Sequence, residues 1–147
     1  MNAKQLSADV ITYANQCGFP ITNLKLQKTL YYLQGYYARK YGEELFSEEI
    51  EHWPYGPVIP TVYFEYCSFG ANAISIPLSD APFSGCSTDE KKVLRMVVDK
   101  CLSLTARKLV EKTHMEWPWR NTQASEIIPF NAILHYFKEN DPLEILV

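Results

Sequence analysis

The side chains best suited to chemistry are two histidines and two glutamates, which form two separate pairs along the chain. Glu51 precedes His52, and His114 lies two residues before Glu116. Histidine and glutamate are common general acids and bases, so the four could serve a small hydrolase or nuclease if the fold gathers them in one pocket. Their spacing matches neither an HExxH zinc motif nor a paired-acid hydrolase. We therefore expect His114 to hold the turn that follows it rather than to transfer protons.

Motifs for nucleotide, metal or nucleophilic chemistry are missing from the sequence. It contains no GxSxG, GxxxxGKS, GxGxxG or HExxH pattern, and its six glycines are scattered. The four cysteines are widely spaced and form no CxxC pair. We predict no catalytic residues, no cofactor and no metal, and we expect reduced thiols in the cytoplasm. A fold-assembled enzyme using the His and Glu residues above stays open as an alternative.

The charge distribution argues against two classes of partner. The net charge is −3, and residues 43–66 carry six acids but no Lys or Arg. Because phosphate neutralisation supplies most nucleic-acid affinity, an acidic chain without a basic cluster is not expected to bind nucleic acid. No apolar run reaches the length of a membrane span, and the first residues lack a signal peptide, so no membrane partner is expected. The acidic block is either solvated surface or a face that steers a basic partner.

Aromatic residues between prolines suggest recognition instead of catalysis. In the stretch WPYGPVIP, Pro54, Pro57 and Pro60 each fix a backbone angle and restrict the preceding residue. Such a segment loses little further entropy when it presents Trp53 and Tyr55 to a partner. The alternative is a structural corner that seats the next helix.

Two further clusters contribute aromatic side chains. Four tyrosines between Leu24 and Tyr37 cannot all face inward on one surface helix, because neighbouring residues differ by about 100°. We therefore expect some of them, Tyr31 among them, at the surface. Farther along, THMEWPW places Trp117 and Trp119 around a proline, either as a core plug or as a recognition surface.

The pattern of apolar residues predicts a mainly α fold, a compact bundle of about five to six helices with a small two-stranded β-hairpin. Two short strands are expected near 46–52 and 73–77, pairing with each other. Pro118 should keep its surroundings irregular, and Gly35 should mark a close approach of another element. No linker or repeat is visible, so residues 1–147 are expected to form one domain. The helices are predicted at 3–17, 23–41, 60–69, 88–102, 105–113 and 129–138.

Three motifs in this order resemble the Panacea domain family, also described as SocA-like or phage-associated GepA-like. The matching stretches are ITNLKLQKTLYYLQGYYARKYG at 21–42, LFSEEIEHWPYGPVIPTVY at 45–63 and TARKLVEKTHMEWPW at 105–119. Thr29 and Pro54 are mild departures from the family pattern, as is the residue at position 32. The chain is therefore identified as a member of this family.

The resemblance implies an antitoxin of a bacterial or prophage toxin–antitoxin pair, a protein-binding domain without catalytic activity. Its partner would be the protein toxin of a neighbouring gene, which it neutralises by direct binding, and one described mode delivers the toxin to the ClpXP protease. A homo-oligomeric scaffold is the remaining alternative. The expected partner-binding residues are Tyr31, Trp53, Tyr55, Gly56, Pro57, Val58, His114, Glu116, Trp117 and Trp119.

The last residues, PLEILV, form an apolar end to the chain. Disordered tails usually contain polar residues, and this segment is mostly apolar, so we expect it to fold back on the core. The alternative is a docking peptide for a partner or a protease.

Overall fold

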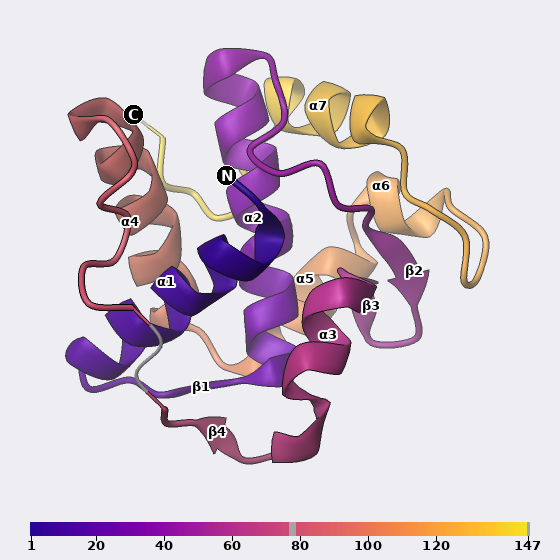
Figure 1. Ribbon diagram of the computed structural model, residues 1–147. Coiled ribbons are helices and arrows are strands. Elements are labelled where there is room, and N and C mark those ends of the chain that lie inside the picture. Colours follow the sequence, from indigo (N-terminus) through magenta and orange to yellow (C-terminus); the bar gives the residue numbers. More distant parts are fainter. Residues whose placement is uncertain (77–78, 147) are drawn as a thin grey trace.

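The computed structural model describes residues 1–76 and 79–146 and is built mainly from α-helices (Figure 1), as the sequence predicts. Seven α-helices occur in this part of the chain, and none is long and apolar enough to cross a membrane. The elements are α1 Ala3–Gln16, β1 Ile21–Thr22, α2 Asn23–Tyr41, β2 Glu51–Trp53, β3 Gly56–Val58, α3 Pro60–Tyr66, η1 Cys67–Phe69, β4 Ala73–Ile74, α4 Thr88–Ser103, α5 Ala106–His114, α6 Trp117–Arg120 and α7 Phe130–Glu139.

Helix α2 is the centre of the molecule and matches its predicted bounds. Thr22 caps its start by accepting a hydrogen bond from Lys25 N, and Gly42, with φ of 73°, ends it. Helices α1, α3, α4, α5 and α7 all contact it, and Figure 1 shows it running between them. Every residue from 26 to 38 is buried as a result.

The predicted close approach at Gly35 is confirmed, and the approaching element is α7. A Cβ atom placed on Gly35 would lie 2.3 Å from the ring of Phe137, which is itself fully buried. Glycine is therefore required at this helix crossing, although it lowers intrinsic helix stability.

The predicted strand pairing is wrong. Strand β2 pairs in antiparallel fashion with β3, only two residues farther along the chain, and β4 pairs with β1. Strands of two or three residues carry too little hydrophobic pattern to specify a distant partner, so tight turns and helix packing decide. Residue 77, the end of the second predicted strand, lies outside the described residues.

The expected irregularity around Pro118 is also wrong, because residues 117–120 form the single turn α6. Pro118 occupies the second position of this turn, where a backbone N–H would lack an intrahelical acceptor in any case. This turn adds a seventh helix to the five or six predicted.

The chain folds back on the core after α7, as the sequence suggests. Leu143 is fully buried, and its N–H donates to Tyr36 Oη. The carboxylate of Asp141 accepts hydrogen bonds from Ile145 N and Leu146 N. The described part of the apolar end is thus attached to α2 and its neighbours.

Candidate partner-binding surface

Polar side chains of α2 hold the chain that follows the β2–β3 hairpin. Gln27 Oε1 accepts a hydrogen bond from Ile59 N at 2.9 Å, and Asn23 Nδ2 donates to Tyr63 O at 3.0 Å. Gln27 Nε2 also donates to Asn23 Oδ1, which links the two side chains. The Gln27 bond is buried and satisfies a backbone N–H that water cannot reach, whereas the Asn23 bond is part-buried. They fix the segment against α2.

Lys28 provides the deepest of these contacts. Its side chain is fully buried, and Nζ donates to Pro57 O at 3.0 Å. Burial lowers the pKa of this amine to about 7. The neighbouring Gly56 has φ of 117°, and a Cβ there would lie 2.5 Å from Lys28 Cε and 2.8 Å from Thr113 Oγ1. Only glycine fits between the lysine and the hairpin.

The hairpin itself projects an aromatic ring into solvent. Trp53 pairs with Gly56, so Pro54 and Tyr55 form the turn, and the fixed φ of proline suits the first turn position. Tyr55 is 68% exposed, whereas Trp53 is partly buried and its Nε1 donates to Glu51 Oε1 at 3.0 Å. The hairpin thus holds one ring against the molecule and the other outside it.

Together with α3, the hairpin forms an exposed aromatic face, which we define as Trp53, Tyr55, Tyr63 and Phe64. The ring centroid of Trp53 lies 4.9 Å from that of Tyr63 and 6.1 Å from that of Phe64, which is 63% exposed. Beside these rings lies a groove of about 320 Å³. It is lined by Asn23, Leu24, Gln27, Trp53, Pro54, Tyr55, Val58, Tyr63, Cys67, Gly70 and Ala71.

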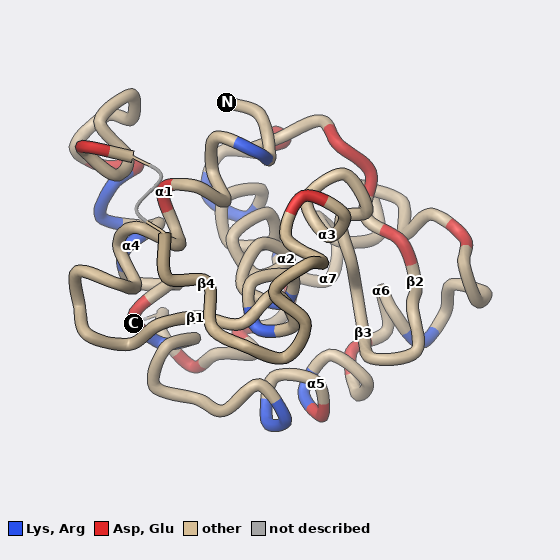
Figure 2. Tube along the Cα trace, turned by 60° about the horizontal axis from the view of Figure 1, so that its bottom comes forward, with Lys and Arg blue, Asp and Glu red and all other residues tan. Residues whose placement is uncertain are grey.

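Acidic side chains border the aromatic face, and one of them is paired with a lysine. Figure 2 shows acidic positions along the chain leading into β2, on β2 itself and on α3. Glu51 lies on β2, and Glu65 lies on α3, where it forms an exposed ion pair with Lys4 at 3.6 Å. None of the residues lining the groove is charged. The face therefore combines an apolar centre with an acidic border.

Trp119 fastens the hairpin to α5 and α6. Its ring is stacked between His52 and His114, with centroid distances of 4.0 and 4.1 Å. Trp119 Nε1 donates to Trp53 O at 3.0 Å, and His52 Nδ1 lies 2.8 Å from Trp119 O. Burial lowers the pKa of His114, so it stacks mainly as a neutral ring.

Glu116 faces the interior. It is 3% exposed and accepts hydrogen bonds from Tyr31 Oη at 2.9 Å and Tyr32 Oη at 2.6 Å. Burial raises the pKa of Glu116 to about 7, although both tyrosine hydroxyls favour the ionised form. Its carboxylate is occupied inside the fold, where a partner protein cannot reach it.

The expectation of surface tyrosines on α2 is wrong. Each hydroxyl instead reaches an acidic side chain: two share Glu116, the third bonds to Asp141 and the fourth to Glu90. The helical angle argument assumes one solvent-facing side, whereas α2 is enclosed by other helices. The four are at most 7% exposed: Tyr31, Tyr32, Tyr36 and Tyr37.

The predicted partner-binding residues do not form one surface. Trp117 packs edge-on against His135 and Tyr136 of α7, each at 5.8 Å between ring centroids, and Trp119 is sandwiched as described above. Of the remaining predicted residues only Tyr55 is exposed, while Trp53 and His114 are partly buried. The buried ones are Tyr31, Gly56, Pro57, Val58 and Glu116.

Most residues of the groove and the aromatic face were missed from the sequence, among them Leu24, Tyr63 and Phe64. Tyr63 and Phe64 are adjacent on the helix predicted for 60–69, so both rings cannot point into one core. The angular pattern that fails for the enclosed α2 holds for α3, because α3 is buried on one side only: Val62 and Tyr66 are buried, whereas Phe64 is exposed.

The residues with acid–base side chains do not converge on one another. Glu51 bonds to the Trp53 indole, Glu116 faces two tyrosines, and the two histidines lie on opposite sides of the Trp119 ring. In residues 1–76 and 79–146 no three His, Cys, Asp or Glu side chains are grouped to hold a metal ion. These histidine and glutamate side chains pack and hydrogen-bond within the fold.

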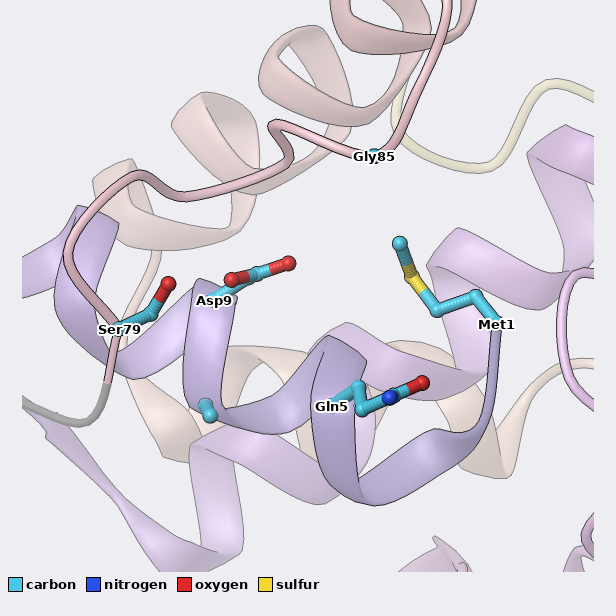
Figure 3. Close-up of a pocket in the computed structure, with 6 residues that line it drawn as sticks. Met1, Gln5, Asp9, Ser79 and Gly85 are labelled. Carbon is cyan, nitrogen blue, oxygen red and sulfur yellow. The ribbon is translucent and has the colours of Figure 1, made fainter.

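A second hollow lies at the start of α1 (Figure 3). It measures about 410 Å³ and is lined by Met1, Gln5, Ala8, Asp9, Ser79 and Gly85. Figure 3 shows the Asp9 carboxylate and the Gln5 amide standing apart, on a wall of α1. Asp9 has the one acidic or basic side chain among these described lining residues.

Comparison with known proteins is consistent with the motifs. Residues 26–120 match the family model described as "Antitoxin SocA-like, Panacea domain". The chain is also similar to the Antitoxin SocA of Caulobacter vibrioides (strain NA1000 / CB15N), with 35% identity over 63 residues. This alignment covers 43% of the chain and 34% of the relative, about a third of that protein's length. No solved structure matches the chain.

The family match spans α2, the hairpin, α3, α4, α5 and α6. It thus includes Gln27 and Lys28 of α2, the aromatic face and the Trp119 stack, and it begins after Asn23. On this evidence the chain belongs to the SocA-like antitoxin family, through a Panacea domain at residues 26–120.

Proposed function

We propose that this protein is an antitoxin that neutralises a cognate protein toxin by binding it directly through the aromatic face. The observation that best supports this is the exposure of Tyr55 and Phe64, at 68% and 63% of their surfaces. Large rings on a rigid support lose little entropy when a partner docks, and such anchors concentrate binding energy.

The contacts that hold the hairpin in place favour a preformed binding surface over a mobile loop. Gln27 and Lys28 hold the hairpin segment from below, and Trp119 holds it from the side. A surface ordered before binding does not need to be ordered by the partner. Helices α1 and α7 lie outside the matched range yet contact α2, so we propose residues 1–147 as one functional unit.

The toxin in this proposal is the protein product of a neighbouring gene, and the complex forms in the cytoplasm. All four cysteines are free, which suits a reducing compartment. The role is non-catalytic, because the acid–base side chains serve packing. Neutralisation then follows either from occlusion of the toxin or from delivery to the ClpXP protease, and both routes need the same docking step.

Co-expression with the neighbouring gene tests the proposal. The wild-type chain should restore growth, and the Tyr55→Ala, Phe64→Ala double variant should not, although it still unfolds cooperatively. Met115→Ala is the matched control, because Met115 is 74% exposed but lies outside the aromatic face. Rescue of growth by the double variant would exclude this face as the docking site.

The same assay in a host without ClpX separates the two routes. Neutralisation that persists there indicates occlusion, and neutralisation that is lost indicates delivery to the protease.

A further inference from the structure

The groove beside the aromatic face has the size and lining of a side-chain receptor. Its volume of about 320 Å³ is at the small end for ligand pockets, which suits one or two large side chains better than a cofactor. Leu24, Trp53 and Tyr63 contribute apolar walls from three different elements. The polar groups of Asn23 and Gln27 in the lining are already bonded to each other and to the backbone. An apolar occupant would therefore leave none of these bonds broken.

A fixed negative charge stands at the rim of this groove. Glu51 Oε1 accepts the indole N–H of Trp53, so the carboxylate is held next to a ring that lines the groove. Lys28 directly follows Gln27, which lines the groove, but the Lys28 side chain is fully buried and its Nζ donates to Pro57 O. It cannot reach the surface to pair with the rim acid.

We propose that the groove binds a segment of the toxin that inserts one large apolar side chain and pairs an adjacent lysine or arginine with Glu51. This inference rests on the proposed function and adds the chemistry of the partner. The position of the Glu51 carboxylate is set before binding, so the ion pair requires little ordering on the antitoxin side. The other acids of residues 43–66 would steer such a basic segment towards the face.

The charges argue against two other occupants. A second copy of the chain docked by two-fold symmetry would bring identical acidic rims together, which costs energy. Nucleic acid would meet acids where it needs cations. A basic protein segment is the occupant that complements the rim.

Cys67 allows a direct test, because it is an exposed free thiol in the groove lining. Three short capped peptides serve as probes: a central tryptophan flanked by lysines, the same tryptophan flanked by glutamates, and a central alanine flanked by lysines. The rate of iodoacetamide alkylation is followed at each cysteine by mass spectrometry. Cys17, which is exposed at the end of α1, is the internal reference.

The lysine–tryptophan peptide should slow alkylation of Cys67 several-fold and leave Cys17 unchanged, whereas the other two peptides should have little effect. Glu51→Gln keeps an acceptor oxygen for Trp53 and removes the charge, so it should abolish the preference for lysine over glutamate. Glu51→Lys should reverse that preference. Glu139→Lys makes the same charge change on the exposed end of α7 and should behave as wild type.

Equal protection by the lysine and glutamate peptides would overturn the inference, as would protection by none of them or an unchanged preference in Glu51→Gln. These results need no toxin, so they are independent of the growth assay. If toxin neutralisation depends on Tyr55 and Phe64 but the peptides show no charge preference, the proposed function stands and this inference fails.

Discussion

The hairpin and the turn at Glu116–Trp119 look alike in sequence but use their aromatic residues in opposite ways. Both place aromatic residues on the two sides of a proline and near a glutamate. In the hairpin, Tyr55 projects into solvent and Trp53 borders a groove. In the turn, Trp119 is stacked between two histidines and Trp117 packs on α7.

The position of each segment relative to α2 explains the difference. The turn follows α5 directly, and its Glu116 is drawn inward by the hydroxyls of Tyr31 and Tyr32. The hairpin is bonded to α2 through its backbone, at Pro57 and Ile59, which leaves side chains of the turn tip free. In the hairpin the backbone is anchored, so an aromatic side chain is free to lie at the surface. In the turn the aromatic side chains themselves are anchored, so they pack against the rest of the fold.

The largest effect should come from breaking the anchor of the hairpin. Gly56→Ala introduces a Cβ at φ of 117° and only 2.5 Å from Lys28 Cε. Strain and overlap together should lower the free energy of unfolding by about 3–5 kcal/mol, measured by urea denaturation. Gly85→Ala is the control, because nothing lies within 4 Å of a Cβ there. Equal midpoints for the two variants would show that the hairpin is not held as described.

Removing the stacked ring should have the next largest effect. Trp119→Ala deletes the ring between His52 and His114 and the bond to Trp53 O. Since Trp119 is only partly buried, a loss of about 3 kcal/mol is expected, at the low end for tryptophan truncation. Thermal and urea unfolding would check this, and an unchanged stability would place Trp119 on the binding surface instead.

Glu116 should make stability depend on pH. Its folded-state pKa of about 7 lies above the ordinary 4.5, so unfolding releases a proton between these values. The free energy of unfolding should therefore fall as pH rises from 4.5 to 7, by about 2–3 kcal/mol from this group. Above this window the lowered pKa of Lys28 acts in the opposite sense, because the unfolded chain then binds more protons.

Glu116→Gln should remove this part of the pH dependence, as Gln cannot ionise but can still accept from a tyrosine hydroxyl. Denaturant titrations of both proteins across the window provide the measurement. The same slope in the variant would mean that Glu116 is not the titrating group.

Much of the helical framework could be predicted from the sequence because local signals fix it. Thr22 and Gly42 delimit α2, and Gly35 indicates a close approach of another element, which the structure identifies as α7. Strand partners could not be predicted, since β1 and β4 have two residues each and carry no usable alternation. The caps and glycines of α2 are local signals, whereas the pairing of β1 with β4 depends on tertiary packing.

The surface was predicted only in part for a similar reason. Tyr55 follows from its place between prolines, but the burial of Tyr31 depends on five helices surrounding α2. Phe64 was missed because its exposure depends on which side of α3 the rest of the fold leaves uncovered. How completely a helix is covered is a property of the tertiary arrangement, which the local pattern of residues does not specify.

The most direct test of the account compares Tyr55→Ala with Trp117→Ala, two rings predicted from the sequence to bind the partner. Titration calorimetry with the purified toxin would give the affinity per folded molecule of each variant. We expect Tyr55→Ala to weaken binding by about 30-fold or more at unchanged stability. We expect Trp117→Ala to lower stability but to leave the dissociation constant within about twofold of wild type. The reverse pattern, with binding lost in Trp117→Ala and kept in Tyr55→Ala, would contradict the account.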